Sequence, residues 1–481
     1  MIPIFLIMIP VAAGLITLFS RRFSLSALVT IASGVAVVIL TWIWVLNGLA
    51  VGAPSFIEND SLSRFFIVII SGVGLLTFIF SFGYMRSRLT TVFRIRRYWV
   101  SINLFFASMC LIPLMSDLIL MWIAIELTTL FSILLVGEDG SKAASGAAWK
   151  YAILALTGSA IALFGLLILD GCESHIGISS FTWHNLAISI GHLPVIPTRL
   201  AIVFILIGFG TKVGLVPLHT WLPDAYSQAP IPACALLSAG EATAVMGVLL
   251  RIIFIANPIA KLQVNTWFII FGILTLGTAS FLLVQVHDIK RMFAYSTIEQ
   301  MGLMLVAGGL GTHLGRQAAL ILLMGQAFIK AACFFTAGII ITICGTSKLD
   351  KMNGLIKSNW RIAFLFGLSG IMIAGLPPFL IFVGEFQILR SALLQNSYVV
   401  AAFVILFVVI SFAAITRAIY PILLGNKPDV IVSSEPINNV STRILKFDRM
   451  TTLTVTIATI AVIGIGGIVL PHVVLNLINE V

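Results

Sequence analysis

Charge is what this sequence lacks most. Only 10% of its 481 residues are Asp, Glu, Lys or Arg, whereas hydrophobic residues make up 60%. Soluble domains carry about 25% charged residues, so a chain with so little charge could not cover the water-exposed surface of several domains. Alternation of polar and apolar residues with a period of two is also missing, which argues against a transmembrane barrel. The chain is therefore expected to be an all-α integral membrane protein.

The five cysteines lack the spacing of a metal or cluster site, because no CxxC pair occurs among them. We expect no zinc, no iron–sulfur cluster, no disulfide framework and no cofactor. The three histidines of the longest outer loop are irregularly spaced in a polar setting, which is typical of solvated side chains rather than metal ligands. They are His175, His184 and His192.

Apolar runs long enough to cross a bilayer occur along the whole chain. One helical crossing needs roughly 20 apolar residues, and about 14 runs qualify. The first has no basic residues ahead of it and no clear cleavage site, which favours a retained span over a signal peptide. The expected spans are residues 2–20, 25–46, 63–84, 99–115, 117–136, 149–169, 200–221, 231–254, 266–286, 292–310, 316–344, 361–382 with a broken continuation to about 395, 398–421 and 451–470.

Lys and Arg alternate between the two sides of these spans. The loops after odd-numbered spans are rich in them, with five arginines between residues 86 and 97, whereas loops after even-numbered spans hold about one each. Because cationic loops stay in the cytoplasm, the net charge of +10 reflects topology and not nucleic-acid binding. We expect a multi-pass protein of the inner (cytoplasmic) membrane with both termini on the non-cytoplasmic side.

Six ionisable residues lie near the centres of expected spans. A charge at bilayer depth costs about 2.5–3.5 kcal/mol even on insertion scales, so six of them favour an ion or proton path over chance. Arg251 and Arg417 lie near span ends and fit structural ion pairs, or side chains that reach the interface, better. The six central residues are Glu126, Lys212, Glu241, Glu299, Lys330 and Glu385.

Glutamates and lysines together suit proton transfer. Burial raises the pKa of a carboxylate and lowers that of a lysine, and a nearby opposite charge reverses each shift. Moving one partner of a Glu–Lys pair therefore moves a proton. A desolvated lysine can lose its proton whereas an arginine cannot, so the choice of lysine at positions 212 and 330 fits a group that changes its charge.

Prolines interrupt two of the expected spans, at Pro217 and at Pro377. A broken helix frees backbone groups that persist at membrane depth only where protein or a water-filled cavity satisfies them. The chain also shows a hint of duplication, because one offset of 173 positions separates two pairs of central residues. The pairs are Glu126 with Glu299 and Lys212 with Glu385.

Blocks of five spans are necessarily inverted when they repeat in a membrane, an arrangement common in transporters. We therefore expect two inverted five-helix repeats at residues 99–255 and 265–421. Three N-terminal spans in residues 1–98 would precede them. A cytoplasmic loop and the last span, in residues 422–481, would follow.

The run from Lys212 to Pro232 resembles the broken-helix signature of one membrane-protein family. This family comprises the antiporter-like subunits of respiratory complex I, Mrp cation/proton antiporters and group 4 membrane-bound hydrogenases. Residues 122–127, 288–302, 375–379 and 384–386 carry further matches, so the resemblance spans nearly the whole chain. Residues 298–302 and 376–379 look most like the membrane subunit of hydrogenase-4 or formate hydrogenlyase.

The resemblance implies a proton channel with two half-paths joined across the membrane centre. By matched position, Glu126 and Lys212 would form the first pair. Lys330 would belong to the central axis and Glu385 to the exit half. His219 would be a relay residue.

Two positions depart from the family pattern. The lysine of the eighth span falls on Thr243 here, with Glu241 two residues earlier. Two residues are about 200° apart round a helix, so both side chains cannot face one path. Gln326 stands where several relatives have histidine. These departures leave open a hypothesis in which this copy is a scaffold that does not pump.

The leading hypothesis is a proton-translocating, non-redox membrane subunit of an oxidoreductase or translocase complex. Its partners would be other membrane subunits and, through them, a peripheral redox module, with the lipid bilayer around it and no nucleic acid. Two alternatives stay open: an Mrp-type Na⁺/H⁺ antiporter subunit and a membrane energy-coupling subunit of an inorganic-carbon uptake complex. The expected proton path consists of Glu126, Lys212, His219, Glu241, Thr243, Glu299, Lys330 and Glu385.

Overall fold

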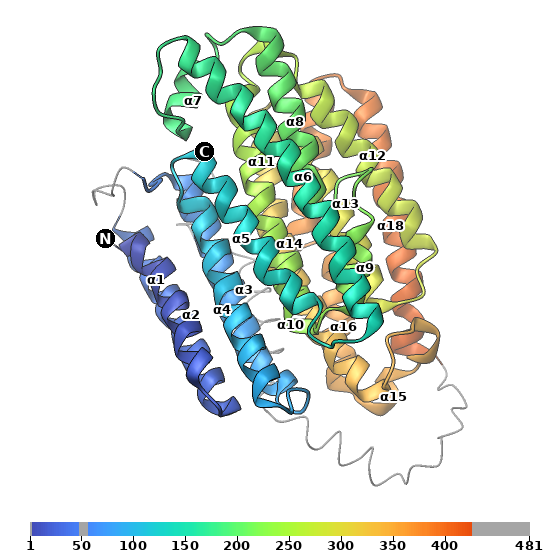
Figure 1. The fold of residues 1–481 in the computed structure, drawn as a ribbon. Coiled ribbons are helices and arrows are strands. Elements are labelled where there is room, and N and C mark those ends of the chain that lie inside the picture. The colour runs from blue at the N-terminus through green and yellow to red at the C-terminus, as the bar shows by residue number, and fades with distance from the viewer. Residues whose placement is uncertain (1, 48–55, 426–481) are drawn as a thin grey trace.

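Long helices lie side by side in a single bundle (Figure 1). The computed structural model describes residues 2–47 and 56–425. Within them, eleven helices are long and apolar enough to cross a membrane. The first thirteen expected spans each coincide with a helix or a broken pair of helices, so the all-α membrane fold is confirmed. The fourteenth expected span, residues 451–470, lies outside the described residues.

The described helices are α1 (Ile2–Phe19), α2 (Phe23–Leu46), α3 (Ser61–Met85), α4 (Val92–Leu114), α5 (Leu118–Val136), α6 (Lys142–His175), α7 (Trp183–Ser189), α8 (Val195–Val213), α9 (Trp221–Gln228), α10 (Ile231–Ala235), α11 (Ala242–Ala256), α12 (Asn265–Val284), α13 (Ile289–Gly309), α14 (His313–Cys344), α15 (Leu355–Ser358), α16 (Trp360–Ile373), α17 (Leu380–Leu394) and α18 (Tyr398–Leu424). Three short turns join them, at Leu236–Glu241 (η2), Ala260–Leu262 (η3) and Leu349–Lys351 (η4). The helices from α4 to α11 and from α12 to α18 follow a similar order, in which a broken helix precedes the last long one. The inversion of the two blocks stays a prediction.

The span formed by α10, η2 and α11 is deeply enclosed in the bundle. Of its most apolar 18 residues, 94% are buried, against 33% for α1. It packs against the long helix α14. Its middle segment η2 is a π-helical turn at Leu236–Glu241. Such turns are rare, occur mostly as single turns inside α-helices and are frequent at functional sites, and nothing in the sequence predicted this one.

The helix α8 ends earlier than the sequence predicted. The span expected over residues 200–221 stops at Val213, because Gly214 adopts a left-handed conformation with a φ of 84°. Glycine commonly ends helices in this way. The chain becomes helical again at Trp221, whose indole Nε1 donates a 2.8 Å hydrogen bond to the carbonyl of Thr211 near the end of α8. The break around Pro217 is therefore stabilised by protein groups, as an interruption inside a membrane requires.

A second break separates α16 from α17 and contains Pro377, as expected. Gly375 lies in it with a φ of 71°. A Cβ atom at this position would lie 2.7 Å from Oε2 of Glu385, well inside contact distance. Glycine thus serves twice here, because it permits the turn and leaves room for a buried carboxylate beside the broken backbone.

Small residues bring α6 and α8 into very close contact. A Cβ atom added to Gly208 of α8 would lie 2.4 Å from the backbone nitrogen of Ala162 and 2.5 Å from the carbonyl oxygen of Gly158, both on α6. Close backbone approach through small residues is the usual way in which membrane helices associate. The contact matters for the site because α8 carries Lys212 and α6 carries Tyr151.

We predict that Gly208→Ala separates α6 from α8 and lowers stability by about 1–3 kcal/mol, the usual cost of overpacking. The matched control is Gly146→Ala, also on a long helix, where an added Cβ meets no atom within 4 Å. The control should keep or slightly raise stability, since alanine favours helix more than glycine does. Apparent melting temperatures of the purified protein in detergent measure both. Equal melting temperatures for the two variants would contradict this account of the packing.

Candidate functional site

A buried ion pair lies where α8 breaks. Nζ of Lys212 is 2.8 Å from Oε1 of Glu241, and both residues are 2% exposed. Lys212 is the second-last residue of α8, and Glu241 is the last residue of the π-helical turn. Two prominent interruptions of regular helix in the first half of the bundle therefore meet at this pair.

Hydroxyl groups from α5 and α6 complete the environment of the pair. Thr128 donates a 2.7 Å hydrogen bond to Oε1 of Glu241. Nζ of Lys212 donates to the hydroxyl of Thr129 and, at 3.2 Å, to that of Tyr151. The Tyr151 hydroxyl in turn donates to Glu241 at 3.2 Å. Each charge thus has several hydrogen-bond partners, which a buried ion pair needs to offset the loss of water.

The ring of Tyr151 connects the ion pair to the break in α8. It stacks on the ring of Trp221 with 4.4 Å between centroids. Trp221 in turn donates the hydrogen bond to the Thr211 carbonyl near the end of α8. The three hydroxyl residues were missed by sequence reasoning, which considered ionisable groups alone. Their signal was present, because Thr128, Thr129 and Tyr151 are polar residues inside long apolar runs.

The direct ion-pair partner of Lys212 differs from the expected Glu126, whose charge still lies close enough to interact with Lys212. Among the described residues, the ion-pair partner of Lys212 is Glu241. Glu126 lies half-buried on α5, and its buried Oε1 atom has no hydrogen-bond partner there. The physical reason is the π-helical turn, which ends at Glu241 and places that carboxylate beside the end of α8.

Thr243 and Glu241 face different neighbours, as the helical geometry predicted. Whereas Glu241 contacts Lys212, the Thr243 hydroxyl lies 3.4 Å from Oε1 of Gln326 on α14. The amide of Gln326 donates a 3.1 Å hydrogen bond back to the carbonyl of Ser238, within the π-helical turn. Gln326 of α14 therefore contacts both α11, at Thr243, and the π-helical turn, at Ser238.

The second buried lysine, Lys330 on α14, is 0% exposed and has no carboxylate within ion-pair distance among the described residues. Its Nζ donates a 2.9 Å hydrogen bond to the carbonyl of Phe293 and another to the hydroxyl of Ser296, both on α13. The Phe293 carbonyl also accepts from Thr297 at 2.9 Å, and Thr297 lies 2.8 Å from the hydroxyl of Ser238. A series of hydrogen-bonding groups thus connects the π-helical turn to Lys330.

The remaining expected path residues occupy separate positions. Glu299 on α13 is 3% exposed, and its Oε2 has no partner among the described residues. Glu385 on α17 is also buried, close enough to Glu299 for the two charges to interact. His219 lies half-buried between α8 and α9, with Nδ1 buried and without a partner in the described part of the chain. The structure thus brings Lys212, Glu241 and their hydroxyl partners together, whereas the described part of the chain shows no hydrogen bond or ion pair between His219 and these residues.

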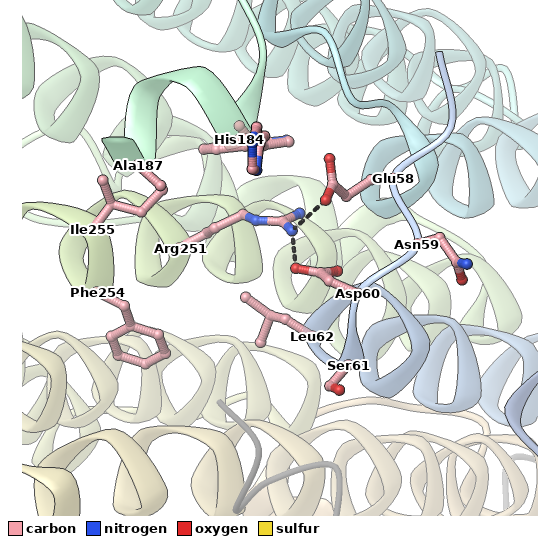
Figure 2. A pocket seen from close by; sticks show the side chains of 11 residues that line it. Glu58, Asn59, Asp60, Ser61, Leu62, His184, Ala187, Arg251, Phe254 and Ile255 are labelled. Carbon is pink, nitrogen blue, oxygen red and sulfur yellow. Dashed lines mark hydrogen bonds and ion pairs between the residues drawn. The ribbon is translucent and has the colours of Figure 1, made fainter. Parts of the chain in front are cut away.

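A cavity of about 520 Å³ opens at the end of the bundle where α7 lies (Figure 2). Figure 2 shows the guanidinium of Arg251, from the end of α11, between the carboxylates of Glu58 and Asp60. The Arg251–Glu58 distance is 3.5 Å, and Asp60 is closer still. Burial raises the pKa of Glu58, while Arg251 opposes that shift. The expectation that Arg251 forms a structural ion pair is confirmed.

The fold and the buried charges define a class of protein, the multi-span membrane subunit with ionisable groups at depth. The family described as NADH:quinone oxidoreductase/Mrp antiporter, TM matches residues 115–411. The family described as NADH-Ubiquinone oxidoreductase (complex I), chain 5 N-terminus matches residues 53–92. The chain belongs to this family of antiporter-like membrane subunits.

Individual relatives agree with that assignment. A hydrogenase-4 component F homolog from Methylacidiphilum infernorum is 34% identical over 356 residues, covering 72% of this chain and 75% of the relative. Subunit 2 of the NAD(P)H-quinone oxidoreductase from Gloeobacter violaceus is 27% identical over 457 residues, covering 94% of this chain and 86% of its own length.

Two solved structures share the fold. One belongs to the membrane-bound sulfane sulfur reductase, an archaeal respiratory membrane complex, with a TM-score of 0.85 and 21% identity over 99% of this chain and 96% of the other. The other belongs to the Mrp complex from Dietzia sp. DQ12-45-1b, with a TM-score of 0.82 and 19% identity over 100% and 96% of the two chains. At these identities the likeness shows the fold alone.

We predict that Lys212 and Glu241 are energetically coupled. Lys212→Met or Glu241→Gln alone leaves a buried charge without its partner, which costs up to about 3–5 kcal/mol. The double variant removes both charges, so its loss of stability should be smaller than the sum of the single losses by about 0.5–3 kcal/mol. Apparent melting temperatures of the purified protein provide the measurement.

The matched control is a second double-mutant cycle, in which Lys212→Met is combined with a substitution of Lys348, an exposed lysine. Lys212→Met and Lys348→Met should have additive effects. Additive losses for Lys212→Met and Glu241→Gln would show that the ion pair does not contribute to the folded state.

Proposed function

We propose that this chain is a proton-translocating membrane subunit of a redox-driven complex. The observation that carries the proposal is the buried Lys212–Glu241 ion pair at a helix break, enclosed by hydroxyl groups. Ionisable residues at membrane depth are costly and usually mark ion or proton paths. A lysine paired with a glutamate can give up its proton to that partner, which an arginine could not do.

The hydroxyls around the pair support proton exchange on chemical grounds. A hydroxyl group both donates and accepts hydrogen bonds, and the Tyr151 hydroxyl lies 3.2 Å from Nζ of Lys212 and 3.2 Å from Oε1 of Glu241. Its oxygen therefore offers a second connection between the two charged groups. Rotation of such a hydroxyl changes which group receives its proton, without movement of a helix.

The connection toward Lys330 supports a path through the centre of the bundle. Ser238, Thr297 and the Phe293 carbonyl form successive hydrogen-bonding groups between the π-helical turn and Nζ of Lys330. Because a carbonyl only accepts hydrogen bonds, the last step needs water or a side-chain rearrangement. We propose that Glu299 and Glu385 continue the path beyond Lys330, and that Glu126 and His219 serve its entrance.

Redox chemistry belongs, in this proposal, to partner subunits. Relatives carry the names of a hydrogenase-4 component and a quinone oxidoreductase subunit, which supports assembly with further membrane subunits and, through them, a peripheral redox module. The positive-inside pattern supports a location in the inner membrane with both termini on the outer side.

An Mrp-type cation/proton antiporter subunit is the second candidate. The support for this candidate is that the chain shares its fold with the Mrp complex, at a TM-score of 0.82 over the whole chain. The two candidates differ in what drives proton movement, because the antiporter needs a Na⁺ gradient and no electron donor.

The test uses the complex purified through a tag on this chain and reconstituted in vesicles that contain a pH-sensitive dye. With the electron donor of the redox subunit that copurifies, the wild type should move protons. Lys212→Met should move at least about tenfold fewer protons per electron, because the exchanging group is lost, while the same subunits copurify. The exposed-residue control Lys348→Met should match the wild type.

Three outcomes contradict the proposal. In one, no redox subunit copurifies. In another, Lys212→Met pumps as the wild type does. In the third, a Na⁺ gradient alone drives proton movement without an electron donor, which selects the antiporter.

A further inference from the structure

A polar cavity lies where α8 and α12 begin, away from the proposed proton path. Its volume is about 600 Å³, and the loop that follows α11 closes one side of it. The residues that bear on its chemistry are Arg199, Asn257, Asn265, Thr266, Trp267 and Ile270. None of them belongs to the group of side chains around the Lys212–Glu241 ion pair.

A fixed guanidinium gives the cavity its charge. Arg199 is the only charged residue among the described residues that line it. Its Nε donates a 2.8 Å hydrogen bond to the carbonyl of Leu262, and its Nη2 donates a 3.0 Å bond to the carbonyl of Lys261. A guanidinium has five N–H donors, so these two contacts orient the group and leave donors for a ligand. None of the described residues that line the cavity is a carboxylate that would neutralise it.

An amide in the same cavity offers an acceptor. Asn257 donates a 2.7 Å hydrogen bond from Nδ2 to the carbonyl of Gly308, which fixes its side chain. The opposite atom, Oδ1, is buried and has no partner among the described residues. A buried oxygen of this kind calls for a donor, because an unsatisfied polar group is costly. The cavity therefore combines a guanidinium that suits an anion with an amide in its wall whose buried oxygen is unsatisfied.

An apolar stripe leaves the cavity along α12. The side chains at four positions on this helix point outward, with exposed fractions of 44% for Trp267, 42% for Ile270, 54% for Leu274 and 58% for Phe281. Spacings of three, four and seven residues place them on one face. Tryptophan is typical of the interface between lipid headgroups and acyl chains, so Trp267 places the cavity at headgroup level and the stripe below it.

We propose that this cavity binds an anionic phospholipid whose headgroup carries hydroxyls, of which phosphatidylglycerol is the simplest. The phosphate lies against Arg199, a headgroup hydroxyl donates to Oδ1 of Asn257, and an acyl chain follows the stripe from Trp267 to Phe281. Charge complementarity selects an anionic lipid over a zwitterionic one. The stripe selects a lipid over free phosphate, which has no apolar part to bury.

The test uses the complex in vesicles of phosphatidylglycerol and phosphatidylcholine in equal amounts. After extraction, native mass spectrometry counts the lipids of each kind that stay bound. Arg199→Gln should weaken retention of one phosphatidylglycerol at least about tenfold, because a charge-assisted hydrogen bond to phosphate is lost. Thr266→Glu, at an exposed position on the cavity wall, should do the same by repulsion and without loss of the Arg199 contacts.

The matched control is Arg390→Gln, the same substitution at an exposed arginine on α17 outside the cavity. It should retain phosphatidylglycerol as the wild type does, and excess glycerol phosphate should not displace the lipid. The proposal is overturned if both cavity variants retain wild-type numbers of phosphatidylglycerol. It is also overturned if phosphatidylcholine is retained equally, if the control loses as much lipid, or if glycerol phosphate competes.

Discussion

The ion pair between Lys212 and Glu241 is the interaction on which the rest of the described structure depends. Removing two charges from water costs several kcal/mol for each, and the pair persists because hydroxyls of Thr128, Thr129 and Tyr151 surround it. Three backbone features bring these groups together. They are the end of α8 at Gly214, the close contact of α6 with α8 at Gly208, and the π-helical turn.

The two buried lysines, Lys212 and Lys330, have different electrostatic environments. Lys212 has a carboxylate partner at 2.8 Å, whereas Lys330 relies on a carbonyl and a hydroxyl of α13. A proton that leaves one environment for the other changes the electrostatic balance of both. In the proposed path, the charge at the α8 break would therefore be coupled to the centre of α14 through the buried segment between them, the π-helical turn with its Ser238 and Gln326 contacts.

Composition and charge patterning predicted the membrane fold, the thirteen spans that fall on described residues, five buried ionisable residues and the half-buried Glu126, because a charge inside an apolar run stands out whatever the fold. The partner of Lys212 could not be predicted in the same way. Counting residues on a regular helix separates Glu241 from Thr243 by about 200°, but it gives no sign that a π-helical turn ends at Glu241. The roles of Tyr151 and the two threonines depend on contacts between helices, which a sequence pattern does not contain.

Infrared difference spectroscopy during turnover tests the central claim most directly, because it detects the C=O stretch of a carboxyl group that gains or loses a proton. If Glu241 exchanges a proton with Lys212, the band should be present in the wild type and in Glu126→Gln, and absent in Glu241→Gln. Persistence of the band in Glu241→Gln, together with its loss in Glu126→Gln, would contradict the account and return the exchange to the carboxylate on α5.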